Sequence, residues 1–477
     1  MSDTHPPLDG HQQSRRQFLF RYANGFAGLA LSALLRESAL AEPADSSLTL
    51  PEPHRTPQAK SIIFLFMDGG PSQVDTFDPK PRLQKEDGQP IPLSVTSTFP
   101  NSGKVLASPF RFRQHGQSGA SVSELFPETA RMVDDMAIVR SVHHEFSNHS
   151  SACYFQHTGH NLPGRPSLGS WLTYGLGSES EELPGYVVID CGIIPSGGTN
   201  NFGSGFLPAS YQGTIFKGNL PQPISDVRPR EEKPDLQRQK LDLIRQLDRY
   251  ELDHFGSSTA LDAAVANYEL AFRMQTAVPD LTNLSAESVA TQKLYGMDRP
   301  ETETYGRACL LARRLVERGV RFIQVTPPDT GNNRWDQHTN LEKGHRQNAA
   351  ATDRAVAGLL SDLKSRGLLD ETLVVWGGEF GRTPSAETKG GRDHNPFGFT
   401  MWLAGGGIRG GTVYGATDDY GYFAVENKVH VHDLHATILH LMGLDHQRLT
   451  YRHSGRDFRL TDVHGRVVKG ILRSPLA

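Results

Sequence analysis

The sequence predicts an α/β protein with a doubly wound, mostly parallel central sheet, helices on both faces and a helical insertion. Short runs of apolar and β-branched residues alternate along the chain with longer segments of helical apolar spacing. Several of the short runs end abruptly in glycine, acidic or histidine residues. A chain of 477 residues with 47 Gly and 30 Pro is long enough for one large, loop-rich domain of this kind.

The run at 61–67, SIIFLFM, predicts a central strand that is buried on both faces. Asp68 follows it directly, and Gly69 and Gly70 then allow a sharp turn beside the carboxylate. Open α/β sheets bind ligands beyond the carboxyl ends of their strands, which makes Asp68 a candidate site residue. The alternative interpretation is that Asp68 only caps the next turn.

The first residues have the features of an export signal. Arg15 and Arg16 form a twin-arginine pair, a weakly apolar run covers 26–35, and Ala39-Leu40-Ala41 suits a cleavage site. We therefore expect a twin-arginine signal peptide over 1–41 and a periplasmic or extracellular protein. The apolar run is too short for a bilayer, and no other segment suggests a stable membrane span.

After a linker at 42–60, we expect one domain over 61–477, with a helical insertion at 217–300 that lies over the sheet like a lid. The further strands that the pattern predicts are 137–142, 184–190, 321–326, 372–376 and 400–404. The helices that it predicts are 124–133, 152–158, 303–318, 353–364 and 432–442, with helical spacing also over 233–295.

Composition excludes some classes of function. The net charge is −4 and no basic patch with interleaved aromatic residues occurs, so nucleic acid is not an expected partner. The three cysteines are odd in number and widely spaced, which argues against a disulfide framework and against a thiolate metal site. The 20 histidines make a site of imidazole and carboxylate ligands the one to look for.

Residues 143–151, HHEFSNHSS, directly precede the predicted helix at 152–158. Exposed N–H groups at a helix start favour an anion, and His149 and Ser150 are candidate catalytic residues there. A helix cap is the simpler alternative role for Ser147 or Ser150.

Other candidate ligands follow later strands. They are Asp336, His338, Glu379, Asp393 and His394. With Asp68 they form a set of carboxylates and imidazoles that suits Zn, Mn or Ca, as one ion or two. Such ions polarise a phosphoryl or sulfuryl oxygen and stabilise the leaving oxygen. Arg382 and Arg392 stand next to candidate ligands and are candidates to hold the substrate oxygens bidentately; surface salt bridges are the alternative.

A resemblance to a known family rests on six stretches: MDGGPSQVDTFDPK, NHSSACYFQHTGH, WDQH, TLVVWGGEFGRTP, GGRDHNP and HDLHATILHLMGL. Together they span roughly 61–443. The chain resembles the twin-arginine-exported, sulfatase-like family called domain of unknown function 1501, in the alkaline phosphatase/sulfatase superfamily. The resemblance implies that Asp68 binds metal, that the nucleophile lies near His149 or Ser150, and that Asp336, His338 and His394 are ligands.

The sequence also departs from the superfamily pattern. Glu379-Phe380 stands where a later strand normally ends in Asp-His or Asp-Asn, and Phe380 cannot bind a metal. No Cys-x-Pro-x-Arg motif occurs, so a formylglycine nucleophile is not expected, and Cys153 is expected in the core.

These features lead to two hypotheses. The first is a secreted metal-dependent hydrolase of phosphate or sulfate esters, acting on a small-molecule or polysaccharide substrate, in which Ser150 attacks or His149 activates water. The second is a catalytically degenerate binding or structural protein of the cell envelope. The geometry discriminates between them: Asp68, Asp336, His338 and His394 within about 5 Å of one point would satisfy the reach of a metal site and favour the first. The sequence does not define the oligomeric state.

Overall fold

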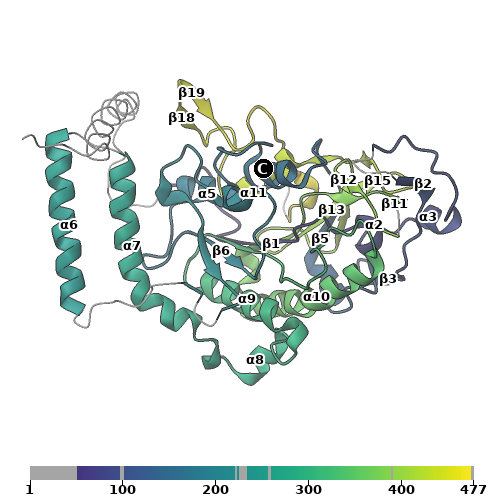
Figure 1. Ribbon diagram of the computed structural model, residues 1–477, viewed down its shortest axis with the longest axis horizontal. Coiled ribbons are helices and arrows are strands. Elements are labelled where there is room, and N and C mark those ends of the chain that lie inside the picture. The colour runs from purple at the N-terminus through teal and green to yellow at the C-terminus, as the bar shows by residue number, and fades with distance from the viewer. Residues whose placement is uncertain are drawn as a thin grey trace, which may run out of the picture.

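A mixed sheet of nine strands lies at the centre of the computed structural model (Figure 1). The structure describes residues 51–96, 101–220, 223–224, 234–255, 259–387 and 390–473. The predicted signal peptide, 1–41, lies outside these ranges. Among the described residues, no helix is both long enough and apolar enough to cross a membrane.

The strand order in the sheet is β14-β5-β13-β9-β1-β8-β6-β7, and β17 also pairs with β5. The strands are β1 (Ser61–Phe66), β5 (Met136–His143), β6 (Tyr186–Asp190), β7 (Thr214–Lys217), β8 (Phe322–Val325), β9 (Thr372–Gly377), β13 (Phe399–Ala404), β14 (Thr412–Tyr414) and β17 (Val429–His430). Within the described part of this sheet, β13 runs antiparallel to both neighbours and the other pairs are parallel. The predicted class, an α/β fold with a mostly parallel sheet, is confirmed.

The central position of β1 follows from its sequence. All six of its residues are buried, and it pairs with β8 on one side and β9 on the other. Ile63 and Leu65 belong to one hydrophobic core, and Ile62 and Phe64 belong to a second core on the opposite face. Alternate side chains of a strand point to opposite faces, so a strand with apolar residues at every position needs a core on both sides.

Helices supply those two cores. They are α4 (His149–Thr158), α5 (Leu168–Leu176), α9 (Pro300–Glu317), α10 (Leu341–Ser365) and α11 (Val431–Leu441). Buried residues of α9 and α10 belong to the first core, and those of α4, α5 and α11 belong to the second. Figure 1 shows α9 and α10 below the sheet and α5 and α11 above it.

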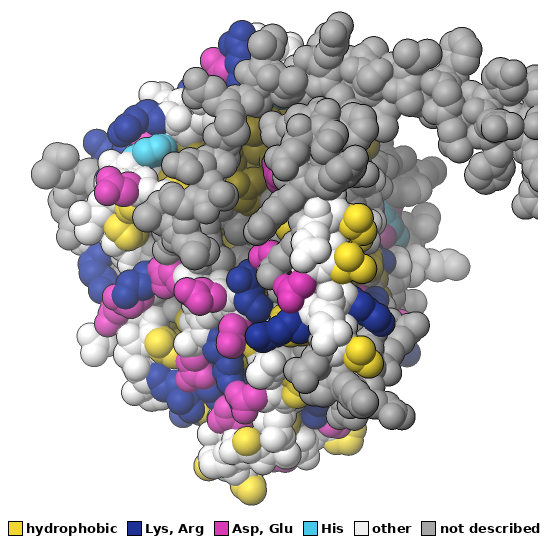
Figure 2. Space-filling view, turned by 90° about the vertical axis from the view of Figure 1, so that its left-hand side faces the viewer, with side chains coloured by type: hydrophobic (Ala, Val, Ile, Leu, Met, Phe, Trp, Pro, Cys, Tyr) yellow, Lys and Arg dark blue, Asp and Glu magenta, His cyan; other side chains and the backbone are white. Residues whose placement is uncertain are grey.

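The region at 217–300 contains α6 (Pro234–Phe255), α7 (Thr259–Thr282) and α8 (Val289–Leu294). Figure 1 shows α6 and α7 beside the sheet, at the left, rather than over it as the sequence-based expectation had them. In the view of this side, basic and acidic side chains are interspersed among the described residues (Figure 2). That surface has no broad patch of a single charge in the part of the chain that Figure 2 colours.

The structure differs from the sequence-based prediction at several elements. Residues 124–133 do not form an α-helix; a 3₁₀ helix, η1 (Thr129–Asp135), lies there instead, because Pro127 lacks the N–H that a helix interior needs. Helix α10 begins at Leu341 rather than 353, since its first turns are rich in polar and small residues that give no apolar period. Strand β7 has four residues and was not predicted.

Candidate metal centre

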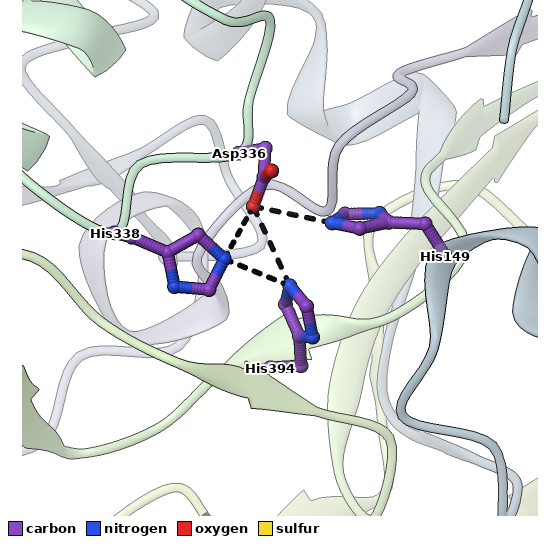
Figure 3. Close-up of side chains that lie close together, drawn as sticks. All are labelled: His149, Asp336, His338 and His394. Carbon is purple, nitrogen blue, oxygen red and sulfur yellow. Dashed lines mark hydrogen bonds and ion pairs between the residues drawn. The ribbon is translucent and has the colours of Figure 1, made fainter. Parts of the chain in front are cut away.

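Four side chains from three distant parts of the chain meet at one point (Figure 3). We call His149, Asp336, His338 and His394 the His/Asp centre. Each offers one ligand atom, and these atoms all lie within 4.8 Å of one another. His149 is the first residue of α4, Asp336 and His338 lie in the loop after β8, and His394 opens the short strand β12 (His394–Asn395).

The three imidazoles point their Nε2 atoms at one carboxylate oxygen, as the dashed lines of Figure 3 show. Asp336 Oδ1 lies 2.9 Å from His338 Nε2, 3.1 Å from His149 Nε2 and 3.4 Å from His394 Nε2. The Nε2 atoms of His338 and His394 are 3.0 Å apart. Three nitrogens and one oxygen thus converge from different sides, as ligands around a cation do.

Carboxylates outside the centre orient two of these rings. Glu379 Oε1 lies 2.5 Å from His149 Nδ1, and Glu387 Oε2 lies 2.6 Å from His338 Nδ1. In each of these two rings, Nδ1 faces a carboxylate outside the centre and Nε2 faces Asp336. This arrangement fixes the orientation and increases the basicity of metal-binding histidines, so it fits a metal centre.

Close backbone contacts hold the loops of the centre together. A Cβ atom added at Gly69, where φ is +105°, would lie 2.7 Å from the backbone nitrogens of Trp335 and Asp336. Gly391 lies so close to the backbone of His338 that a Cβ there would lie 2.0 Å from its carbonyl carbon. Glycine at these two positions therefore allows the loops after β1 and β8, and the strand that carries His394, to pack against one another.

Arg382 positions Asp336 from behind the centre. It is fully buried in β10 (Gly381–Arg382), which pairs with β12 so that Arg382 lies opposite His394. Its guanidinium lies 2.6 Å from Asp336 Oδ1 and also donates to the carbonyl oxygens of Gly69 and Gly70. The structure thus directs Arg382 toward the protein, whereas the sequence-based prediction gave it to the substrate.

The charges of the centre are strongly coupled. Burial disfavours a charged His149, but its contacts with Asp336 and Glu379 outweigh burial and raise its pKa to about 9. For Asp336, burial opposes ionisation, yet hydrogen bonds from the three histidines hold its pKa well below the usual range. Burial lowers the pKa of His394 to about 4. His149 therefore carries a proton at neutral pH that a cation would have to displace, and His394 does not.

A family model described as a protein of unknown function, DUF1501, matches residues 59–472. The protein belongs to the DUF1501 family. This confirms the family that the sequence motifs predicted. A comparison with curated proteins gives no match.

Solved structures that are similar to the DUF1501 chain include a sulfatase, an alkaline phosphatase and a lipoteichoic acid synthase. A sulfatase from a Pseudoalteromonas species is 13% identical, with 82% of this chain and 68% of that chain covered and a TM-score of 0.34. The alkaline phosphatase of the Antarctic bacterium TAB5 is 11% identical, with 81% and 99% covered and a TM-score of 0.33. A lipoteichoic acid synthase from Listeria monocytogenes is 8% identical, with 85% and 76% covered and a TM-score of 0.33.

In the DUF1501 chain, Asp68 lies outside the His/Asp centre, which differs from the predicted arrangement. It belongs to a second group with Cys153 and Glu379, whose ligand atoms lie within 4.8 Å of one another. Arg334 forms an ion pair with Asp68 Oδ2, and the thiol of Cys153 donates to Asp68 Oδ1 over 3.6 Å. Burial and the neighbouring Glu379 raise the pKa of Asp68 to about 6, although Arg334 and His149 oppose this. Glu379, predicted as a ligand, belongs to this second group and also contacts His149 of the His/Asp centre.

Ser150 follows His149 in the first turn of α4. The cap of this helix is Asn148, whose Oδ1 accepts hydrogen bonds from the backbone N–H groups of Ser150 and Ser151. The alternative in which Ser150 caps the helix is therefore wrong. Ser150 is half-buried and is the neighbour of His149 in the sequence. Its catalytic role stays a prediction.

Arg392 does not reach the His/Asp centre. Its guanidinium lies 2.7 Å from Asp75 Oδ2, and both side chains are fully buried. The structure thus gives Arg392 a buried ion pair in place of the predicted contact with substrate oxygens. Asp393 Oδ1 accepts a hydrogen bond from the backbone N–H of His394 at 2.7 Å, and Asp393 forms a third group with His338 and Glu387.

Sequence reasoning missed two residues that the structure places beside the centre, Glu387 and Arg334. Glu387 belongs to the short strand β11 (Ser385–Glu387), which pairs with β2 (Asn101–Val105), and no local pattern marks it. Arg334 directly precedes the WDQH motif and stands two residues before Asp336. This short distance along the chain was the one signal that the sequence offered.

Proposed function

We propose that this DUF1501 protein is an exported, metal-dependent hydrolase of phosphate or sulfate esters, with a small-molecule or polysaccharide substrate. The observation that carries the proposal is the convergence of three imidazole nitrogens and one carboxylate oxygen within 4.8 Å, with carboxylates behind two of the rings. The twin arginines at 15 and 16 support export.

The donor set favours zinc. Imidazole and carboxylate ligands in a set of four fit tetrahedral Zn²⁺. Mn²⁺ accepts the same ligand types, whereas Ca²⁺ takes six to eight oxygens, which three histidines do not offer. His149, Asp336, His338 and His394 would hold the ion. When bound, it would supply Lewis-acid polarisation of the ester and of the leaving oxygen.

The residues around the ion have separate roles in this proposal. Arg382 keeps Asp336 ionised and oriented, and Glu379 and Glu387 keep His149 and His338 turned toward the centre. Ser150, next to His149 at the N-terminal turn of α4, would be the nucleophile. The positive end of α4 would favour the negative charge of a phosphate or sulfate ester at the same place.

The test combines metal analysis with activity. Mature protein is loaded with Zn²⁺ or Mn²⁺, its metal content is measured by plasma mass spectrometry, and hydrolysis of aryl phosphates and aryl sulfates is assayed. The proposal expects bound metal and turnover of one ester class, with both lost in His338→Ala and only turnover lost in Ser150→Ala. A metal-loaded chain that is inert toward both ester classes contradicts the hydrolase.

A second candidate function is a binding or structural protein of the cell envelope that keeps the metal and lacks turnover. One observation favours it. The ring of Phe380 is buried against the centre, with centroids 4.6 Å from the ring of His394 and 4.8 Å from that of His149. An apolar ring there takes up space beside the proposed ion. Metal binding without hydrolysis of either ester is the result that this candidate expects.

A further inference from the structure

The second acidic group, Asp68 with Cys153 and Glu379, poses an electrostatic problem. Asp68 is 1% exposed and Glu379 is fully buried, and their ligand atoms lie within 4.8 Å of each other. Two buried carboxylates at this distance repel each other, so each needs its own positive partner. Glu379 has His149, at 2.5 Å. Asp68 has Arg334, through an ion pair with Oδ2.

Protein donors already use both oxygens of Asp68. Oδ2 accepts from Arg334, and Oδ1 accepts from the backbone N–H of Ser196 at 3.3 Å and from the thiol of Cys153 at 3.6 Å. Burial raises the pKa of the Cys153 thiol well above its ordinary value, so this group offers a thiol rather than a thiolate. A cation at this place would have to displace Arg334.

The loop holds Arg334 in place. Asn333 and Arg334 both have left-handed backbones, with φ of +62° and +60°. The carbonyl oxygen of Arg334 accepts hydrogen bonds from the side-chain amides of Gln337 and Asn348. Two successive left-handed residues other than glycine persist only where the surroundings fix them, and these amides do so. Arg334 is therefore a built part of the site and not a surface side chain that happens to bend inward.

From these contacts we infer that Arg334 occupies the position of a second cation beside Asp68 and keeps the centre mononuclear. Its guanidinium supplies a fixed positive charge next to Glu379 and His149, where a second ion would otherwise neutralise the carboxylates. About a quarter of its side chain, 24%, remains exposed, so the same charge also faces solvent. The inference rests on the proposed metal site and adds the number of ions that it binds, one per chain.

The test counts the metal ions bound per chain in the mature protein after dialysis against excess Zn²⁺ or Mn²⁺. The wild type is expected to bind one ion per chain, Arg334→Met two, and Arg334→Met with Asp68→Asn one again. Arg334→Lys, which keeps the charge, is expected to bind one. Arg452→Met, at an exposed ion pair with Asp457, is the matched control and is expected to bind one.

Two results would overturn the inference. One is a wild type that binds two ions and loses one in Asp68→Asn. The other is a folded Arg334→Met chain with no ion beyond the wild-type count. If Arg334→Met does not fold, Asp68→Asn alone decides, since an unchanged count supports the inference and a lost ion contradicts it. The wild-type count tests the proposed metal site, whereas the difference between Arg334→Met and wild type tests Arg334.

Discussion

His149 is held between two carboxylates: its Nδ1 lies 2.5 Å from Glu379 Oε1 and its Nε2 lies 3.1 Å from Asp336 Oδ1. The Glu379 side chain is fully buried, whereas the side chains of Asp336 and His149 are each 19% exposed. Because both carboxylates favour the protonated ring, a metal ion and a proton compete for His149.

Glu379→Gln removes the carboxylate behind His149 and keeps its size. We expect the affinity for Zn²⁺ to fall by about 10- to 100-fold, because outer carboxylates orient histidine ligands and increase their basicity. Competition with a fluorescent chelator measures this. Glu371→Gln, at an exposed ion pair with Lys60, is the matched control and should bind as the wild type does. Equal affinities in all three chains would contradict the role given to Glu379.

Metal binding should release a proton. The pKa of His149 is raised to about 9, so below that pH the ring is protonated and a cation must displace the proton. The affinity is therefore expected to rise with pH through neutrality and to level off above pH 9, by about tenfold per pH unit for one proton. Calorimetry in two buffers of different ionisation enthalpy counts the released protons. A count of zero at pH 7 would show that His149 is not a ligand.

Gly69→Ala should damage the centre from a distance. Its Cβ would lie 2.7 Å from the backbone nitrogens of Trp335 and Asp336, so the loop that carries Asp336 must shift. We expect at least tenfold weaker metal binding and a loss of about 1–3 kcal/mol of stability. Gly88→Ala is the control, since Gly88 also has a positive φ, +73°, but no atom within 4 Å of an added Cβ. Urea unfolding and metal titration of both variants separate backbone strain from displacement of the loop.

Arg392→Met should affect stability rather than the metal. It leaves the fully buried Asp75 without its partner, which costs about 3–5 kcal/mol. Arg473→Met, at an exposed pair with Asp370, should cost less than about 1 kcal/mol. Chemical unfolding gives both values. If Arg392→Met unfolds like the wild type but loses substrate affinity, the substrate-binding role predicted from the sequence was the correct one.

The sequence alone predicts the fold and much of the centre, for physical reasons. A strand such as β1, with six buried residues in succession, is hard to mistake for another element. Asp336 and His338, in the loop after β8, and His394, which the sequence placed in a loop beyond the strand at 372–376, come together in the structure. His149 also lies in this cluster, although the sequence suggested a catalytic role for it and not a ligand role.

Other features depend on contacts that no local pattern records. Asp68 lies outside the centre and pairs with Arg334, which belongs to a loop with two left-handed residues. Glu387 contacts His338 from β11, a short strand that pairs with β2. Arg392 forms a buried ion pair with Asp75 and does not face solvent. In each case the side chain's partner lies far away in the sequence, so the composition of the segment gives no sign of it.

The central claim is that His149, Asp336, His338 and His394 jointly bind one cation. Anomalous diffraction from crystals of the zinc-loaded protein tests it most directly. The account predicts one peak about 2.0–2.2 Å from the three Nε2 atoms and from a carboxylate oxygen of Asp336. A peak elsewhere on the chain, or none at this centre after loading at pH 8, would contradict it.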